Sequence, residues 1–485
     1  MNEGQTTCDV LFKGGRVIDG TGAAGVDADV AVTGDRIVAV GDLGHWQTGE
    51  TIDASGRVVA PGFIDVHTHD DRLVLDTPGM APKVSQGVTS VVVGNCGVSL
   101  SPLAPCEDPP APMTLIGTKD DYRFASFADY AATVDAAPAA VNVAPLIGHS
   151  TLRVACMEAI DRAATAAETE AMVDLLDQSL AAGAIGFSTG LAYPTAKAAP
   201  TDEVVALAAC LKGHGAIHTT HMRDEAEHVL ASVDETIDIG RRAGCEVVIS
   251  HHKCAGKPNW GMSRETLPRI AAAQATMPLA FDVYPYTASS TALLKNFIER
   301  AERVVVTWST PHPEMEGRDF QSILDEWGVD RDTAVDRLSP AGALYYQMDE
   351  GDLRRIMATP GAMIGSDGLP HDAFPHPRLW GTFPRVLGHY SRELGLFPLE
   401  EAVHRMTGRS AAVFGFADRG VVREGAFADL VVFDPETVID RATFEAPMEP
   451  AAGIDLVMVN GGVTWRDGAW SGARPGRRLT RRAAG

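Results

Sequence analysis

The sequence predicts an α/β protein built on a (β/α)8 barrel of the TIM type, with a small β-sandwich formed by both chain ends and an insertion near the barrel mouth. Three observations predict this fold. Eight short apolar segments alternate with helical stretches through the middle of the chain, turn-rich alternating segments lie at both ends, and the seventh and eighth apolar segments are unusually far apart. A length of 485 residues accommodates one such barrel with extra elements.

The two ends of the chain share one pattern. DVLFKGGRVIDGTG, ADVAVTGDRIVAVG and ETIDASGRVVAPG place Gly-Gly, Asp-Gly and Gly-Asp pairs between apolar runs, which is typical of antiparallel strands and hairpins. GAFADLVVFDPETV and IDLVMVNGGVTWRDG repeat the pattern near the C-terminus. Strands from opposite ends can pair only if the ends meet, so residues 1–61 and 415–485 are predicted to form one β domain.

Residues 62–414 are predicted to form the catalytic barrel. Its eight strands are expected at residues 63–69, 89–96, 140–147, 184–188, 216–221, 246–251, 279–284 and 362–367. A helix is expected to begin at Thr165, where Thr-Ala-Ala-Glu forms a capping box. Residues 288–345 exceed what one βα unit needs and are predicted to be a lid-like insertion over the barrel mouth.

Composition narrows the function class. A net charge of -23 would repel nucleic acid and anionic lipid, and no apolar run approaches the about 18 residues of a membrane span, so neither partner is expected. The N-terminal sequence lacks a secretory pattern, and seven scattered cysteines favour reduced thiols, so a cytoplasmic protein is expected. The sequence does not reveal the oligomeric state, for which a monomer is the working expectation. The basic C-terminal RRLTRRAAG is predicted to be a solvated tail.

Six side chains suited to metal binding stand at the predicted strand ends. They are His67, His69, Cys96, His221, His251 and Asp367. Functional groups of such barrels gather at the C-terminal ends of strands, where imidazole, thiolate and carboxylate can bind zinc. A single histidine at a strand end is more often structural than a ligand, but six suitable groups favour zinc, with one tight site and room for a second, weaker one.

Two neighbouring residues, Asp65 and His149, keep two interpretations each, and His252 is assigned a structural role. Alternation places Asp65 on the same face as His67 and His69, where it could be an acid at the site or a group that orients a ligand. His252 points to the opposite side if its strand stays extended, which favours a structural role. His149 follows the third predicted strand, and the sequence leaves open whether it lines the pocket or lies outside it.

Zinc chemistry predicts the reaction class. The ion lowers the pKa of bound water towards about 7 and polarises a carbonyl oxygen, so an amide is the natural target. Asp367 is the best candidate to take the proton from that water and pass it to the leaving nitrogen, although it could also be a simple ligand.

The motifs VVAPGFIDVHTHDD and GAFADLVVFD resemble the amidohydrolase superfamily, whose members pair a metal-bearing barrel with a β-sandwich made from both ends. The chain departs from the common pattern because its fourth strand, GAIGFSTG, has no lysine to bridge metals. Cys96 in GNCG is the expected substitute. With GHSTLR, THMRDE, VVISHHK, IGSDGLPHD and HPRLWGTFPRVLGHY, it makes the chain similar to the D-aminoacylase family nearly end to end.

This resemblance implies a role for each candidate residue. The tight zinc site would consist of Cys96, His221 and His251, and the weaker site would involve His67, His69 and Asp367, with Asp367 also the general acid and base. The substrate α-carboxylate would be held by Lys253, Tyr284 and Arg378. Tyr193 and Ser290 would touch the scissile carbonyl or the carboxylate.

The predicted function is zinc-dependent hydrolysis of small-molecule N-acyl-D-amino acids to a carboxylate and a free D-amino acid. The alternatives are a cyclic-amide hydrolase of the dihydroorotase or hydantoinase type and a non-catalytic scaffold. The amino-acid side chain stays open: an arginine of the insertion, Arg300 or Arg303, would favour acidic substrates if it entered the pocket, and Glu299 would reject them.

Overall fold

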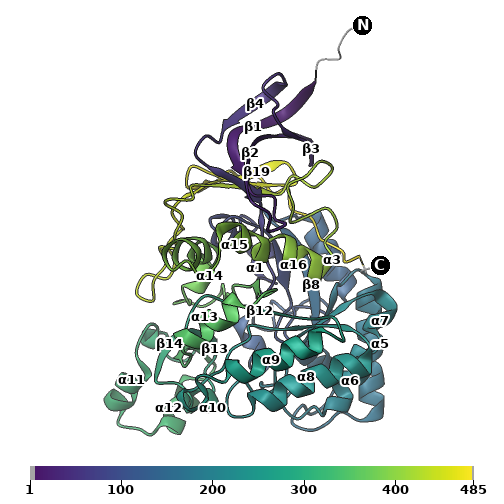
Figure 1. Cartoon of the computed structure of the whole chain (residues 1–485). Helices are drawn as coiled ribbons and strands as arrows, with labels where there is room; N and C mark the ends of the chain where they lie inside the picture. The colour runs from purple at the N-terminus through teal and green to yellow at the C-terminus, as the bar shows by residue number, and fades with distance from the viewer. Residues whose placement is uncertain (1–5, 483–485) are drawn as a thin grey trace.

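The computed structural model describes residues 6–482 and contains a parallel eight-stranded barrel below a large sheet (Figure 1). The barrel strands follow one another in chain order: β6 (Phe63–Asp65), β7 (Val88–Val93), β8 (Asn142–Gly148), β9 (Gly186–Gly190), β10 (Ile217–His221), β11 (Glu246–Ile249), β12 (Leu279–Val283) and β16 (Met363–Ile364). A parallel bridge between Thr68 and Gly368 joins the two edges of this sheet. The predicted fold class and all eight predicted strands are confirmed.

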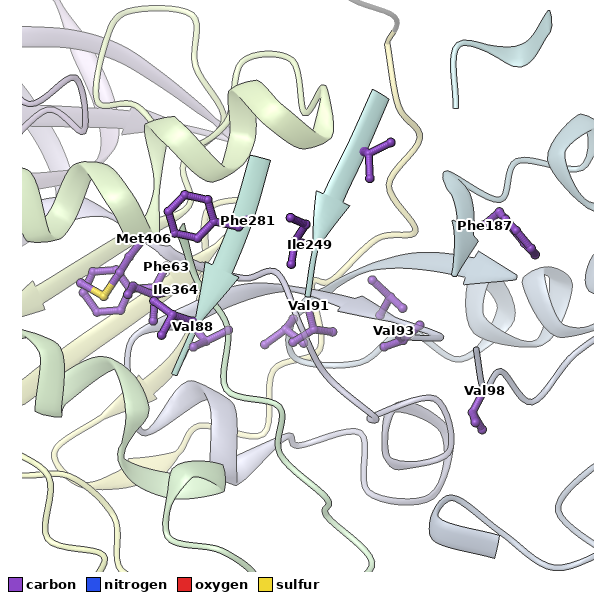
Figure 2. Packing of buried hydrophobic residues seen from close by; sticks show 14 of the residues in the cluster. Phe63, Val88, Val91, Val93, Val98, Phe187, Ile249, Phe281, Ile364 and Met406 are labelled. Atoms are coloured by element: carbon purple, nitrogen blue, oxygen red, sulfur yellow. The ribbon is translucent and has the colours of Figure 1, made fainter. Parts of the chain in front are cut away.

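The strands form because their apolar side chains alternate between two cores. On β7, Val91 and Val93 pack against the surrounding helices, whereas Val92 belongs to the cluster that fills the barrel. Figure 2 shows the outer core, with Ile249 and Phe281 from two further strands. Burial on both sides explains the nearly continuous apolar runs of these strands.

Helices follow most strands and cover the barrel. They are α1 (Leu73–Asp76), α2 (Ala81–Val84), α3 (Phe127–Ala136), α4 (His149–Cys156), α5 (Ala166–Ala181), α6 (Thr201–Ala208), α7 (Leu211–His214), α8 (Val229–Ala243), α9 (Ser263–Gln274), α13 (Glu350–Ala358), α14 (Arg378–Arg385), α15 (Leu399–Met406) and α16 (Gly408–Phe414). A π-helical segment (Val386–Glu393) continues α14, and 3-10 turns occur at Met113–Leu115 and Lys257–Asn259. The capping box predicted at Thr165 is present: its side chain accepts from Glu168 N, and the Glu168 side chain accepts from Thr165 N.

Strands from both chain ends form one continuous sheet (Figure 1). They are β1 (Thr7–Val17), β2 (Val26–Thr33), β3 (Arg36–Gly41), β4 (Gln47–Asp53), β5 (Val58–Pro61), β17 (Leu430–Phe433), β18 (Ile454–Val459), β19 (Gly462–Arg466) and β20 (Ala469–Trp470). The ends meet where β5 pairs antiparallel with β17. The sheet buries apolar residues on both faces, with Phe12 and Val30 in one cluster and Leu11 and Ala31 in another.

The insertion carries its own three-stranded antiparallel sheet and packs beside the barrel (Figure 1). Its elements are β13 (Ala288–Ala292), α10 (Lys295–Ile298), β14 (Arg303–Ser309), a 3-10 turn (Pro313–Met315), α11 (Phe320–Trp327), α12 (Arg331–Leu338) and β15 (Ala341–Tyr346). This sheet contributes side chains to an apolar cluster that also contains Cys96 of the barrel.

The C-terminal segment differs from the prediction of a solvated tail over the residues described. Arg478 lies 3.0 Å from Asp135, and Arg481 lies 2.6 Å from Glu246 with its side chain only 4% exposed. These ion pairs hold the segment against the barrel. Within residues 6–482, no helix combines the length and apolar character needed to cross a membrane.

Candidate active site

The six predicted donors converge at one end of the barrel, but only His221 lies within a strand. The strands that precede the other five end two to four residues before the donors, which corrects the predicted boundaries. Cys96, His251 and Asp367 have φ of 53°, 37° and 51°, in the left-handed region that residues other than glycine rarely adopt. Such backbone is concentrated at functional sites, because the surrounding structure must hold it there.

The donors form two groups that share Cys96. In the first group, His67 Nε2 lies 3.2 Å from Cys96 Sγ, and Asp367 Oδ1 lies 3.2 Å from His69 Nε2. In the second group, Cys96 Sγ lies 3.3 Å from His251 Nε2, and His221 completes the set. Within each group the donor atoms all lie within 4.8 Å of one another, which is the spacing of ligands around one ion.

The donor set fits zinc. Both ring nitrogens of His221 are buried, and neither has a hydrogen-bond partner among residues 6–482. Burial raises the pKa of the Cys96 thiol, but the imidazoles of His67 and His251 outweigh burial and hold that pKa well below its usual range. A thiolate flanked by imidazoles and a carboxylate is a zinc-type donor set.

A buried network of charged residues holds the segments that carry the first donor group. Lys83 Nζ donates to Asp65 Oδ2 at 2.8 Å and to Ser366 Oγ at 2.9 Å, and it lies 3.3 Å from Asp70. Asp65 Oδ1 in turn accepts from the backbone N of His67 and of Ser366. Asp65 therefore orients the segment of His67 and belongs to neither donor group.

The residue that follows strand β16, Gly365, lies very close to His67. A Cβ at Gly365 would lie 2.5 Å from His67 Cβ, so only glycine fits there. Asp367 N donates to His67 O at 2.8 Å, which fixes the eighth strand end against the first. On the opposite side, Asp282 of β12 accepts from His251 N at 2.8 Å and lies 3.5 Å from His67 Nδ1.

The three residues expected to hold a carboxylate lie together. Arg378 is fully buried, its Cζ lies 4.5 Å from the centre of the Tyr284 ring, and Lys253 Nζ lies 5.6 Å from the same ring. Arg378 Nη1 is 2.8 Å from Asp367 Oδ2. Burial raises the pKa of Asp367, but Arg378 and the neighbouring imidazoles outweigh burial and hold that pKa well below its usual range.

Tyr193 and Ser290 connect the site to the insertion. The Tyr193 ring lies 4.8 Å from the His221 ring, and its hydroxyl is 2.9 Å from Thr291 Oγ1. The Ser290 carbonyl accepts from Arg378 Nη2 at 3.1 Å. Both residues thus border the groups that the sequence assigned to substrate.

The structure directs His149, which the sequence left undecided, and His252, which was predicted to be structural, away from the donors. His149 Nε2 lies 3.0 Å from Glu203 Oε1, in a buried network with Arg153. His252 Nε2 lies 2.8 Å from Thr266 Oγ1 of the α9 helix. His252 points away because the backbone turns at His251, not because the strand stays extended.

Three contact residues of the site were not predicted from the sequence: Lys83, Asp282 and Glu225. Glu225 stands in the quoted motif THMRDE, four residues after His221, and is 7% exposed. Its Oε1 lies 2.8 Å from Lys253 Nζ and 3.0 Å from His251 Nδ1. Its spacing of four residues from His221, a predicted ligand, was the one feature of the sequence that could have indicated that Glu225 belongs to the site.

Comparison with known proteins agrees with this architecture. The amidohydrolase family matches residues 50–306 and 317–465. A D-aminoacylase of Alcaligenes xylosoxydans xylosoxydans is 55% identical over 98% of both chains. From the same organism, an N-acyl-D-aspartate deacylase is 50% identical over 99% of this chain and 96% of that one, and an N-acyl-D-glutamate deacylase is 48% identical over 99% and 98%.

Solved structures extend the similarity to three dimensions. A D-aminoacylase crystal structure aligns with a TM-score of 0.96 at 54% identity, over 98% of this chain and 100% of that one. An N-acyl-D-glutamate deacylase from Bordetella bronchiseptica, complexed with zinc and a phosphonate that mimics the tetrahedral intermediate, aligns with a TM-score of 0.94 at 48% identity over the same shares. A D-hydantoinase reaches 0.61 at 16% identity over 98% and 99%, which shows a common fold alone.

Proposed function

Because this chain belongs to the amidohydrolase family, we propose that it is a zinc-dependent enzyme that hydrolyses N-acyl-D-amino acids to a carboxylate and a free D-amino acid. The observation that carries the proposal is the thiol of Cys96 between imidazoles of two donor groups, in a chain whose close relatives are deacylases of D-amino acids. Zinc held there would supply a water of lowered pKa and a Lewis acid for the amide carbonyl.

Each donor receives a role under this proposal. Cys96, His221 and His251 hold the tight zinc, and His67, His69 and Asp367 surround a second, weaker site. Asp367 takes a proton from the attacking water and gives it to the leaving amide nitrogen. Its lowered pKa keeps it a carboxylate at neutral pH, which is the form that accepts this proton.

Arg378, Lys253 and Tyr284 bind the substrate α-carboxylate. Two buried cations face one aromatic ring, so a carboxylate that enters between them meets charge-assisted donors in a protein whose overall field is negative. Ser290 and Tyr193 border the same space and contact the carboxylate or the scissile carbonyl. With carboxylate and carbonyl both fixed, only one configuration at Cα points its side chain into the remaining pocket, which accounts for selectivity between enantiomers.

We propose that this pocket prefers apolar side chains. An apolar cluster reaches the metal donors from the insertion through Tyr193 and Phe297, whose rings are 6.3 Å apart. The charged candidates of the insertion are engaged elsewhere: Arg300 lies 2.6 Å from Asp224, and Arg303 lies 2.9 Å from Asp319. Glu299 lies in a separate groove of about 680 Å³ beside Arg300.

The test is release of free amino acid from matched N-acetyl-D and N-acetyl-L panels in the presence of zinc. We expect turnover of the D isomers alone, with kcat/KM for the methionine, leucine and phenylalanine derivatives at least about tenfold above that for the aspartate and glutamate derivatives. Turnover of L isomers, or of neither isomer by zinc-loaded protein, would contradict the deacylase function. A preference for acidic D substrates would contradict only the apolar pocket.

A cyclic-amide hydrolase is the weaker alternative. It shares the fold with this chain at low sequence identity, and the fourth strand β9 offers Ser188 and Thr189 but no lysine to bridge metals. Activity on hydantoins or dihydropyrimidines without activity on acyl-D-amino acids would establish it.

We also propose residues 1–61 with 415–485 as a β domain, 62–414 as the catalytic barrel and 288–345 as its insertion. The pairing of β5 with β17 and the separate sheet of β13, β14 and β15 support these boundaries. A cytoplasmic monomer remains our expectation, and the seven unpaired cysteines favour a reducing compartment.

A further inference from the structure

We propose that Glu225 is a positioning residue that decides which ring nitrogen of His251 is free to bind metal. The proposal rests on the zinc-dependent function above. It assigns one buried carboxylate to a ligand of the tight site, and it explains why an acidic side chain stands beside a group of metal donors without belonging to it.

The carboxylate of Glu225 contacts the imidazole of His251 and one cation, and the imidazole of His221 lies just beyond hydrogen-bond distance. Oε1 lies 3.0 Å from His251 Nδ1 and 2.8 Å from Lys253 Nζ, and Oε2 lies 3.6 Å from His221 Nε2. The backbone holds the side chain in place, because Glu225 O accepts from Ala255 N at 2.7 Å and so ties together the segments that follow β10 and β11.

A carboxylate only accepts hydrogen bonds, so an imidazole nitrogen that pairs with Glu225 must carry the proton. In His251 that nitrogen is Nδ1, which leaves the lone pair on Nε2, 3.3 Å from Cys96 Sγ. His221 Nε2 lies 3.6 Å from Glu225, beyond hydrogen-bond distance, so the choice concerns His251 alone. The carboxylate therefore leaves Nε2 of His251 for the metal.

Lys253 makes this choice necessary. Its Nζ lies 2.7 Å from His251 Nδ1 as well as 2.8 Å from Glu225 Oε1. If the ammonium donated to Nδ1, the proton of His251 would move to Nε2, and that nitrogen could not bind an ion. Glu225 accepts from both the Lys253 ammonium and His251 Nδ1, and its negative charge keeps Nδ1 protonated beside the ammonium.

The experiment compares zinc affinity, by competition with a chelator, in full-length wild type and Glu225→Gln. The amide has no negative charge and a single acceptor oxygen, so it cannot keep His251 Nδ1 protonated beside the ammonium, and we expect zinc to bind about 10–100-fold more weakly. The absorption spectrum of the cobalt-substituted protein should also change, because the ligand field depends on which nitrogens bind.

A double-mutant comparison separates orientation from general support. Lys253→Met alone should leave zinc affinity within about threefold of wild type, and Glu225→Gln with Lys253→Met should recover most of the loss, since the competing ammonium is gone. Glu203→Gln is the matched control: this buried glutamate lies 3.0 Å from His149 Nε2 but contacts no donor of either group, so zinc affinity should not change.

Unchanged zinc affinity and an unchanged cobalt spectrum in folded Glu225→Gln would overturn the proposal, as would an equal loss in Glu203→Gln. If Glu225→Gln does not fold, Glu225→Asp replaces it: the shorter carboxylate cannot reach both His251 Nδ1 and Lys253 Nζ, so unaltered affinity there has the same meaning. Zinc binding does not depend on the substrate, so a wild type that binds zinc but deacylates nothing would reject the proposed function and leave this test valid.

Discussion

Replacement of Asp367 by asparagine should remove turnover and spare the tight metal site. The carboxamide has the shape of the carboxylate and keeps an acceptor toward Arg378, which lies 2.8 Å away. It cannot accept and return a proton. A positioned acid and base contributes about 10²–10⁴-fold, which corresponds to roughly 2.7–5.4 kcal/mol in the activation barrier.

The structure predicts that the loss appears in kcat and that zinc binding and KM are affected less. Asp367 belongs to the group of His67 and His69, not to that of His221 and His251, so one zinc per chain should remain bound. Arg378 loses a buried counterion but stays in place over the Tyr284 ring, so KM should change less than kcat.

The assay is steady-state hydrolysis of N-acetyl-D-methionine with metal content measured on the same samples. Asp352→Asn is the control: this buried aspartate of α13 accepts from the backbone of Gly261 and makes no hydrogen bond or ion pair with a metal donor among residues 6–482, so its kcat should stay near that of wild type. If kcat of Asp367→Asn fell by less than about tenfold with zinc retained, another group would carry the proton.

Three further predictions test the surroundings. Arg378→Ala should lower kcat/KM roughly 30-fold or more for substrates with a free α-carboxylate, and a similar loss with α-esters would contradict the clamp. Lys83→Met leaves Asp65 and Asp70 buried without their cation, so urea unfolding should show a loss of about 3–5 kcal/mol; an unchanged midpoint would refute the network. Burial lowers the pKa of His252 from 6.5 to about 4, so the folded state resists its protonation and stability, complete above about pH 6.5, falls towards pH 4. His252→Gln should therefore show a smaller drop in thermal midpoint from pH 7 to pH 5 than wild type, with zinc content unchanged.

The sequence predicted the existence of the barrel strands far better than their ends. Apolar runs fix a strand because both of its faces are buried, as on β7. The same runs continue smoothly into Cys96 and His251, and nothing in their composition signals the left-handed backbone that turns those residues toward the metal site. Such conformations are imposed by contacts with neighbouring strand ends, which single-sequence patterns do not contain.

The donors were predictable because six residues of metal-binding types follow apolar runs that predict strands, whereas their partners were not. Asp282 sits inside β12 and Lys83 on the short α2 helix, where each has the ordinary appearance of a polar residue. The contacts of Asp282 with His67 and of Lys83 with Ser366 join segments far apart in the chain. Only Glu225 stood at a fixed short spacing from a donor.

The cations of the site have a further consequence for substrate choice. Arg378 already faces Asp367, and Lys253 already faces Glu225, so each cation proposed for the substrate also balances a carboxylate next to the metal donors. A substrate carboxylate therefore completes a charge arrangement and does not enter an empty positive pocket. An acyl amide without that carboxylate leaves the buried Nε of Arg378, which has no hydrogen-bond partner among residues 6–482, without an acceptor, and this penalty falls on binding at the reacting position. Under the proposed function, selection for the α-carboxylate therefore depends on the same cations that pair with Asp367 and Glu225 beside the metal donors.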